Sequence, residues 1–226
     1  MVISGFIAVC LLFIGLGLLI KNQLGALSRW DTDVSQWLVD HRTSGTNDWT
    51  RYATGAADTL GILVVLVIAI VVLVLIRHRW AAFFLGLALA LELMSFLAID
   101  AVVDRPRPNV VRLGTLPSTS SFPSGHTAAM LTLYGGLALI LSGRFRSSII
   151  RIVACLGVIL VTAAVGFGRV YRGMHYPSDA VAGALLGLAV LCVAALAVRA
   201  GQLAIAKRSE SHPEESGRSF LSQVVR

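Results

Sequence analysis

Long apolar segments alternate with short polar ones along almost the whole chain. Each apolar run is continuous, and each is close to the 20 or so residues that a helix needs to cross a hydrocarbon core of roughly 30 Å. Because lipid cannot satisfy exposed backbone groups, such runs indicate helices rather than barrel strands. The pattern predicts six membrane spans, at Met1–Ile20, Thr59–Ile76, Ala81–Ile99, Thr127–Gly143, Ile152–Gly168 and Ala180–Val198.

The segment between the first two spans, residues 21–58, has an amphipathic pattern instead. Apolar residues recur there at three- and four-residue spacing, which predicts helices lying in the membrane interface. A second such helix is expected after a cap at Asn47. We therefore expect an all-α membrane protein with one transmembrane domain over residues 1–199 and a cytoplasmic tail over 200–226. The residues that carry the amphipathic pattern are Leu27, Trp30, Val34, Trp37, Leu38, Trp49 and Tyr52.

Composition agrees with a membrane protein. Of the 226 residues 56% are hydrophobic and 14% charged, against roughly 25% charged in soluble domains. A net charge of +7 could suggest nucleic acid, but such binding needs a water-facing basic surface that this chain lacks. We expect no nucleic-acid partner.

Cys10, Cys155 and Cys192 lie in apolar runs without metal-ligand spacing. The first run has neither a basic leader nor a cleavage site, so we expect it to be retained.

The distribution of basic residues predicts the orientation. Arginines and lysines flank the turns after the second and fourth spans and follow the sixth, and the positive-inside rule assigns these to the cytoplasm. Both termini are then cytoplasmic in a multi-pass protein of the cell membrane, and the loops 100–126 and 169–179 face outwards. The residues that set this orientation are Arg77, Arg79, Arg144, Arg146, Arg151, Arg199, Lys207 and Arg208.

The outer loops also contain arginines, which topology does not explain. Arginine stays protonated and presents a planar fork of donors that matches phosphate oxygens. Residues 123–126 open the fourth span, where unpaired amides and the helix dipole favour an anion. Ser124 adds a hydroxyl there, and Gly125 permits close backbone approach. The candidate phosphate ligands are Arg105, Arg107, Ser124, Gly125, Arg169 and Arg172.

Two histidines in these loops suit two steps of phosphate chemistry. His175 and Asp179 are four residues apart, so they share a face if the helix has begun, and Asp179 can hold one imidazole nitrogen. An imidazole so oriented is a general base or a nucleophile, and beside a phosphate the natural step is attack on phosphorus. His126, with an ordinary pKa of about 6.5, would protonate the leaving oxygen. The outer loops show no metal-ligand spacing, so no metal cofactor is expected.

These motifs resemble the type 2 phosphatidic acid phosphatase superfamily, whose pattern is K-x6-R-P, P-S-G-H and S-R-x5-H-x3-D on a six-helix membrane core. Residues 123–126 match the second motif completely. Arg169, His175 and Asp179 match the third at full spacing, with Gly168 in place of its serine. The joint spacing is far more specific than a single four-residue match.

The first motif matches at Arg107 and Pro108, but Asp100 stands at its lysine position. An anion there would repel phosphate by roughly 1 to 3 kcal/mol in a partly dry site. One hypothesis is that Arg105 or Arg172 replaces the lost charge while Asp100 pairs with an arginine. The other is that Asp100 contacts a substrate hydroxyl and shifts specificity.

The resemblance implies His175 as nucleophile, Asp179 as its orienting partner, His126 as general acid and no metal ion. It implies phosphate binding by Arg107, Ser124, Gly125 and Arg169. Glu92, in the third span, is expected to face the bundle interior and has no assigned catalytic role.

We therefore expect an integral membrane hydrolase that acts on a lipid phosphate or diphosphate at the outer face, through a phosphohistidine. Polyprenyl diphosphate, phosphatidylglycerophosphate and phosphatidic acid are the candidate substrates. One alternative is a phosphoryl transferase on the same scaffold. Another, which Asp100 makes conceivable, is a non-catalytic lipid-phosphate binder or a transporter. The six spans disfavour a soluble acid phosphatase or haloperoxidase with related motifs.

Overall fold

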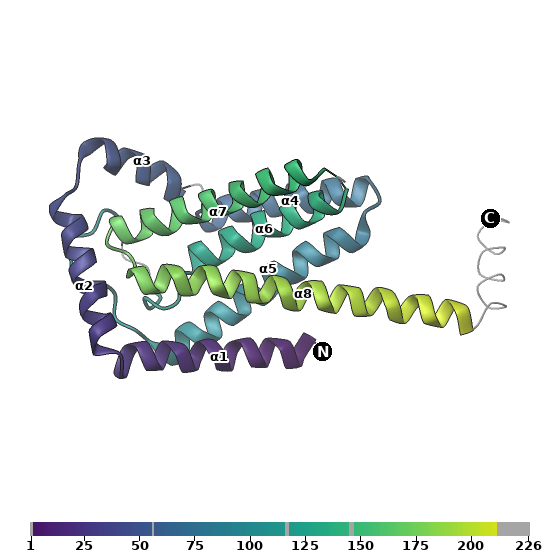
Figure 1. Ribbon diagram of the computed structural model, residues 1–226, viewed down its shortest axis with the longest axis horizontal. Coiled ribbons are helices and arrows are strands. Elements are labelled where there is room, and N and C mark those ends of the chain that lie inside the picture. Colours follow the sequence, from purple (N-terminus) through teal and green to yellow (C-terminus); the bar gives the residue numbers. More distant parts are fainter. Residues whose placement is uncertain (1, 56, 116–117, 145–146, 212–226) are drawn as a thin grey trace.

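A computed structural model describes residues 2–55, 57–115, 118–144 and 147–211 of the chain. Within these ranges every regular element is a helix, and Figure 1 shows most of them side by side in one bundle. In chain order the helices are α1 (Val2–Asn22), α2 (Gly25–Asp40), α3 (Ser44–Gly55), α4 (Thr59–Leu75), α5 (Arg79–Val103), α6 (Gly125–Arg144), α7 (Ser148–Tyr171) and α8 (Pro177–Ser211).

The helices confirm the predicted membrane architecture. Five of them, α1, α5, α6, α7 and α8, are each long and apolar enough to cross a membrane. Helices α3 and α4, bent by 45° at the break between them, reach that threshold only as a pair, so the count is five crossings, or six if this pair forms one span. Each predicted span lies on one of these helices, since a continuous apolar run leaves no other backbone structure open in lipid. The chain is thus a multi-pass, all-α membrane protein.

The predicted interfacial helices are also present. Helix α2 lies across the end of the bundle rather than along it (Figure 1), and both Trp30 and Trp37 are exposed on it. The expected cap at Asn47 is wrong, because α3 begins at Ser44. The hydroxyl of Thr43 accepts a hydrogen bond from the Thr46 amide at 3.2 Å, which satisfies one of the free amides at the start of the helix.

The described chain also differs from the predicted start of the tail at residue 200. Helix α8 continues to Ser211, because no glycine-proline stop follows Val198 and the apolar run resumes at Leu203. The remainder of the predicted tail, residues 212–226, lies outside the described residues.

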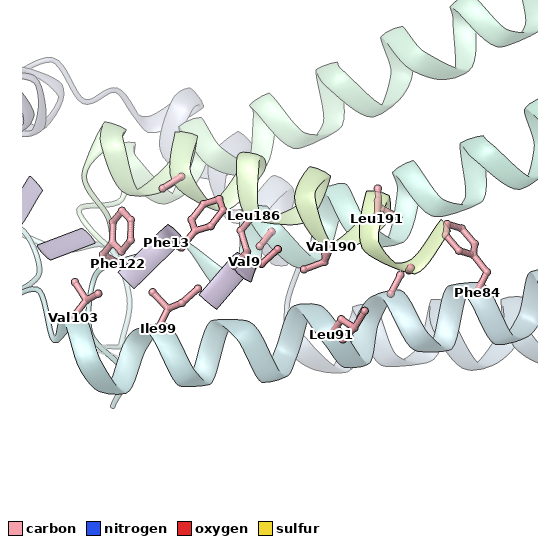
Figure 2. Close-up of a cluster of buried hydrophobic side chains, with 14 of the residues drawn as sticks. Val9, Phe13, Phe84, Leu91, Ile99, Val103, Phe122, Leu186, Val190 and Leu191 are labelled. Carbon is pink, nitrogen blue, oxygen red and sulfur yellow. The ribbon is translucent and has the colours of Figure 1, made fainter. Parts of the chain in front are cut away.

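The main core lies between α1, α5 and α8. Its side chains, among them Phe13, Ile99 and Leu186, interdigitate along the bundle axis (Figure 2). Phe122 extends this core beyond the helices, and it is fully buried although it belongs to the loop before α6. A Cβ atom added to Gly17 of α1 would lie 2.7 Å from the Phe122 ring. Van der Waals packing of this closeness, rather than water exclusion, holds helices together in lipid, and here it anchors the loop as well.

A close approach of α6 and α8 joins the two loops that carry the second and third motifs. A Cβ atom added to Gly183 would lie 2.3 Å from the carbonyl oxygen of Ser124, so only glycine fits there. The backbone amide of Ser124 donates to the carbonyl oxygen of Asp179 at 3.0 Å. The starts of α6 and α8 are therefore held in one fixed relation.

Candidate active site

The predicted site residues come from the loop after α5, the start of α6, the end of α7 and the link into α8. These segments meet at the end of the bundle that α2 crosses (Figure 1). The starting end of α1 and the far end of α8 point the other way, so the site lies at the end opposite to both. Convergence of the three motifs, separated by up to 79 positions between Asp100 and Asp179, results from the packing of α5, α6 and α8.

His175 occupies the centre of this end and is only 2% exposed. Its Nδ1 lies 2.7 Å from the carbonyl oxygen of Ser121, and its Nε2 lies 3.3 Å from a guanidinium nitrogen of Arg107. A carbonyl only accepts and a guanidinium only donates, so Nδ1 carries the proton and the lone pair of Nε2 faces Arg107. Burial, together with the charges of Arg169 and Arg107, lowers the pKa of His175 well below its usual value. A lowered pKa favours the neutral imidazole, whose Nε2 faces the guanidinium of Arg107.

The predicted direct contact between Asp179 and His175 is wrong. Helix α8 begins at Pro177, so His175 lies outside it and the four-residue spacing does not put the two on one face. Asp179 instead accepts hydrogen bonds from the Ser121 hydroxyl at 2.5 Å and the Tyr176 amide at 2.9 Å. The second of these caps the helix start, as a carboxylate at its third position does in a capping box. Asp179 therefore acts on His175 through Ser121.

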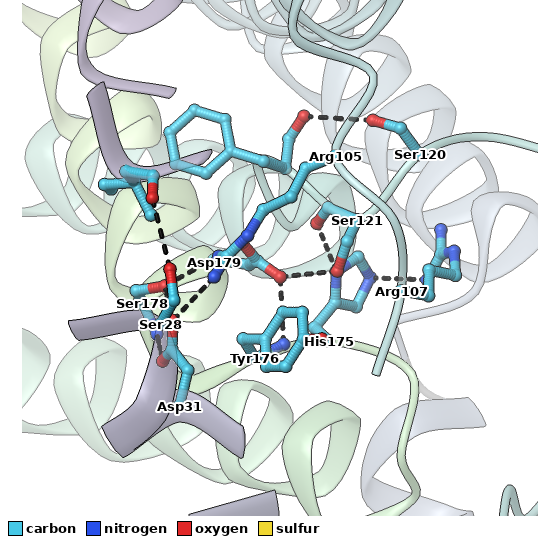
Figure 3. Close-up of polar contacts among 12 residues, drawn as sticks. Ser28, Asp31, Arg105, Arg107, Ser120, Ser121, His175, Tyr176, Ser178 and Asp179 are labelled. Atoms are coloured by element: carbon cyan, nitrogen blue, oxygen red, sulfur yellow. Dashed lines mark hydrogen bonds and ion pairs between the residues drawn. The ribbon is translucent and has the colours of Figure 1, made fainter. Parts of the chain in front are cut away.

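Ser121 is a site residue that sequence reasoning missed. Its carbonyl accepts from His175, its hydroxyl donates to Asp179, and its amide donates to the carbonyl oxygen of Arg105 at 2.8 Å. Figure 3 shows it between the histidine and the aspartate. A serine next to other serines in a loop carries no sequence signal that distinguishes it from a solvated one, so only the fold identifies it.

Arg105 does not reach a phosphate site, contrary to expectation. Its guanidinium bonds Asp179 at 2.5 Å, Asp31 at 2.8 Å and the Ser178 hydroxyl at 2.8 Å, and it lies over the Tyr176 ring at 4.3 Å. Nearby carboxylates raise its pKa, outweighing the opposing effect of burial. One face and both terminal nitrogens of the guanidinium are thus engaged within the protein (Figure 3).

Asp31 is the second residue that the sequence reasoning missed. It is fully buried and comes from α2, where its carboxylate also accepts from the Ser178 amide at 3.0 Å. A signal was present, because Asp31 shares the helix face of Leu27, Val34 and Leu38, which packs on the bundle. A carboxylate on an apolar face needs a buried cation.

A cavity of about 480 Å³ is lined by His175, but not by Arg105, Asp31 or Asp179. It collects five of the predicted site residues at one end, and the rest of its wall, between α4, α5 and α6, is almost entirely apolar. Within the described ranges of the chain, the predicted residues that line this cavity are Arg107, Gly125, His126, Arg169 and His175.

Arg169 is the most unusual member of this group. It is only 8% exposed, yet its Nε atom is buried without any hydrogen-bond partner among the described residues. A buried guanidinium with unused donors is costly unless an anion completes it. Arg107 contributes a second guanidinium, which now donates to Thr119 and to the carbonyl oxygen of Met174. Burial lowers the pKa of Arg107, and Asp179 and Asp100 partly offset this effect.

His126 follows the first residue of α6 and also faces the cavity. Its Nε2 lies 3.6 Å from a carboxylate oxygen of Asp58, at the start of α4. Asp58 had no assigned role in the sequence, where it stood only as the end of the interfacial segment. The structure brings it close enough to stabilise charge on this histidine.

Two further predicted ligands point elsewhere. The hydroxyl of Ser124 is fully buried against that of Thr127, at 2.9 Å. Arg172 donates to the carbonyl oxygen of Asn47 at 3.4 Å. It lines a separate hollow of about 510 Å³ on the α3 side, which shares Arg169 with the apolar cavity.

Among the described residues Asp100 forms no ion pair with an arginine, and it does not line the cavity. One of its carboxylate oxygens accepts from both the amide and the hydroxyl of Ser120, at 2.8 and 2.7 Å. It therefore fixes the backbone between Thr119, which binds Arg107, and Ser121, which binds His175. The expected pairing with an arginine is therefore limited to a longer-range effect on Arg107, and a contact with a substrate hydroxyl stays a prediction. As for metals, the described part of the chain contains no group of three or more His, Cys, Asp or Glu side chains placed to hold one.

Comparisons with known proteins agree with this geometry. Phosphatidylglycerophosphatase B of Bacillus subtilis (strain 168) is 29% identical over 132 residues, which are 56% of this chain and 63% of that protein. The crystal structure of the first transmembrane PAP2 type phosphatidylglycerolphosphate phosphatase from Bacillus subtilis superposes with a TM-score of 0.74 at 23% identity, covering 84% of this chain and 93% of that one. Aquifex aeolicus LpxE superposes with a TM-score of 0.57 at 24% identity, covering 72% and 92%.

The two structural likenesses concern the fold. A family model described as the PAP2 superfamily matches residues 80–202. This stretch begins at the start of α5 and ends within α8, and it includes all three motifs. Since it also covers more than half of the sequence, the chain belongs to the PAP2 superfamily.

Proposed function

We propose that this protein hydrolyses the phosphate of a membrane lipid through a phosphohistidine on His175. The observation that carries the proposal is the buried guanidinium of Arg169, whose Nε has no hydrogen-bond partner among the described residues and which lines the same cavity as His175. Arg169 and Arg107 supply two positive charges, and neither forms an ion pair with a carboxylate in the part of the chain that the structure describes. A phosphate bound in the cavity would neutralise both charges and accept hydrogen bonds from both arginines, and it would then lie next to His175.

The shape of the cavity favours a lipid over a small soluble phosphate. Its walls beyond the polar end are formed by apolar side chains of α4, α5 and α6. Leu63 and Leu93 line it while remaining about half exposed on the outer surface of the bundle. A lipid tail can therefore lie partly in the cavity and partly in the membrane while its phosphate meets the two arginines.

The first chemical step follows from the tautomer of His175. The Nε2 lone pair attacks phosphorus, so that a P–N bond forms as the P–O bond to the lipid breaks. Protonated His126 donates its proton to the leaving oxygen, so a monophosphate substrate releases a lipid alcohol and a diphosphate substrate releases a lipid monophosphate. Arg107 and Arg169 stabilise the charge on the phosphoryl oxygens, and the free amides at the start of α6, beside Gly125, add to this.

In the second step water attacks the phosphohistidine. His126, now neutral, accepts a proton from the water while the P–N bond breaks and His175 regains its lone pair. The polar hollow on the α3 side shares Arg169 with the cavity, and it offers water and inorganic phosphate a route apart from the lipid tail. No step requires a metal ion.

The names of the relatives point towards phosphatidylglycerophosphate as one substrate to test. Phosphatidic acid and polyprenyl diphosphate fit the same phosphate ligands. Transfer to an acceptor other than water would give a transferase, and absence of turnover would leave a binder or transporter. Release of inorganic phosphate against formation of a new phosphoester separates these outcomes.

The decisive experiment measures phosphate release from these three lipids by purified protein in the presence of a chelator. We expect turnover by the wild type and a loss of at least about 1000-fold in His175→Gln. With lipid labelled at the phosphate, the wild type should yield an acid-labile, alkali-stable phosphoprotein, and His175→Gln should not.

Ser95→Ala is the matched control, since this buried residue of α5 lies outside the cavity. Full activity in His175→Gln would contradict the mechanism. Complete loss of wild-type activity on adding the chelator would contradict its independence of metal.

We further propose that the site faces the outside of the cell membrane. The basic residues that predict the cytoplasmic side follow α4 and α6 and extend along the end of α8, all opposite to the site. In a chain whose three cysteines are changed to serine, Asp48→Cys should react with a membrane-impermeant maleimide in intact cells. Arg79→Cys should not. The reverse pattern would invert the orientation.

A further inference from the structure

One carboxyl group interrupts the apolar wall of the cavity. Glu92 lies on α5 and lines the cavity beyond its phosphate-binding end, among Leu89, Leu93 and Phe96. It is 4% exposed, and no hydrogen bond or ion pair joins it to any described residue. The mechanism proposed above makes no use of it.

A carboxyl group without a partner inside a membrane-spanning helix is unfavourable, and such groups usually mark a functional contact. The other buried acids of this protein show what a structural carboxylate looks like. Asp31 and Asp179 each accept several hydrogen bonds and share Arg105. Glu92 has no such set, and it faces open volume instead of protein. Its partner is therefore to be sought in whatever fills the cavity.

The depth of Glu92 narrows the identity of that partner. A Cβ atom on Gly125, at the start of α6, would lie 3.0 Å from the Phe96 ring, so Phe96 marks the level of the phosphate end. Glu92 is one helical turn further from the site, which is roughly 6 Å along α5. In a glycerolipid with a terminal phosphate, five bonds separate phosphorus from the nearest ester carbonyl carbon, about 6 Å when extended. In a polyprenyl phosphate only hydrocarbon lies at that depth.

We propose that Glu92 is a specificity-determining residue that hydrogen-bonds an ester or hydroxyl group of a glycerolipid phosphate and so favours glycerolipids over polyprenyl phosphates. A protonated carboxyl donates to an ester carbonyl, and either form accepts from a hydroxyl. A polyprenyl chain leaves Glu92 buried and unpaired, which is the kind of loss that lets an enzyme reject an analogue. This inference rests on the proposed function, because it assigns the lipid that occupies the same site.

The test compares phosphatidic acid with a polyprenyl phosphate of similar length. In Glu92→Leu we expect the ratio of kcat/KM for the two lipids, glycerolipid over polyprenyl, to fall about 10- to 100-fold. Glu92→Gln retains a donor and an acceptor and should keep the ratio within about threefold of wild type. Ser95→Ala, a buried change on the same helix away from the cavity, should leave the ratio unchanged.

A merely structural role for Glu92 would lower kcat/KM for both lipids equally and reduce Tm, and that result would overturn the proposal. So would an unchanged ratio in Glu92→Leu. Binding separates this inference from the proposed function, because Kd for each lipid is measurable in the His175→Gln background without turnover. A fall in the Kd selectivity on adding Glu92→Leu supports the role of Glu92 even if the wild type hydrolyses neither lipid. An unchanged selectivity refutes it even if both are hydrolysed.

Discussion

Arg105 and Arg107 are two residues apart in one loop, yet they occupy opposite regions of the site. Arg105 lies in a buried network with two aspartates, two serines and an aromatic ring (Figure 3). Arg107 lies against Arg169 and the two histidines at the polar end of the cavity. One guanidinium is fully compensated by the protein, and the other shares its surroundings with a second positive charge.

This difference in charge balance distinguishes the region that supports the structure, around Arg105, from the region proposed to bind the substrate, around Arg107. The network side carries two carboxylates against one guanidinium, and its hydrogen bonds fix Ser121 and the start of α8. The cavity side carries a buried guanidinium, that of Arg169, and a half-buried one, that of Arg107, while Asp58, which lies near His126, is largely exposed. A rigid region that is already satisfied can hold an unsatisfied one in place, which is how a site stays ready for an anion before the anion arrives.

Replacement of Arg105 should give the largest effect. Arg105→Leu leaves Asp31 and Asp179 buried without their cation, which costs about 3 to 5 kcal/mol of stability. We expect Tm in detergent to fall by about 10 °C and activity to fall with it. Thermal unfolding followed by intrinsic fluorescence measures the shift. A variant as stable as wild type would show that the network does not support the fold.

Replacement of Arg107 should reduce activity strongly and stability little, the reverse of what we expect for Arg105. Arg107→Leu removes a donor to the phosphoryl oxygens, so phosphate release should fall by about 100- to 1000-fold. Tm should stay within a few degrees of wild type, because the lost charge faces another positive group, Arg169. Steady-state kinetics and thermal unfolding of the same preparation check both statements. A large fall in Tm with little loss of activity would exchange the roles assigned to the two arginines.

Replacement of Asp100 should have a smaller effect on both stability and activity. We call its two hydrogen bonds with Ser120 the brace. Asp100→Asn weakens the two hydrogen bonds to Ser120 and should cost about 1 to 2 kcal/mol of stability, with a loss of activity of about tenfold or less. Asp100→Lys, which restores the family residue, removes the brace and should not raise activity. A several-fold gain in phosphate release by Asp100→Lys would show that the aspartate repels the substrate after all.

Titration of His175 should have the smallest effect of the four, because it should change activity and stability little near neutral pH. The pKa of His175 is lowered in the fold, so the nucleophile stays neutral and the acid limb of kcat/KM should fall below pH 6.5. The unfolded chain protonates His175 first, so its contribution to stability is full above about pH 6.5 and declines as the pH falls through the ordinary range. The ionisation of the substrate phosphate, measured by its phosphorus chemical shift, serves as the control. An acid limb above pH 6.5 would contradict the lowered pKa.

The sequence was sufficient for the helices, because each apolar run in lipid has one possible backbone structure. It was also sufficient to choose the motif residues that line the cavity, such as His126 and Arg169. It could not separate Arg105 from Arg107, because the two have the same local sequence signal and differ only in which carboxylates the fold brings near. Asp31 and Ser121 were missed for the same reason. Their roles depend on partners that are about 150 and 50 positions away, across contacts made only by packing.

Helix α2 carries one more consequence. It lies across the end of the bundle with tryptophans exposed, and through Asp31 it holds both Arg105 and the first turn of α8. An interfacial helix takes its depth and tilt from the lipid around it. Headgroup packing and bilayer thickness should therefore influence the position of α2 and, through it, the geometry around His175.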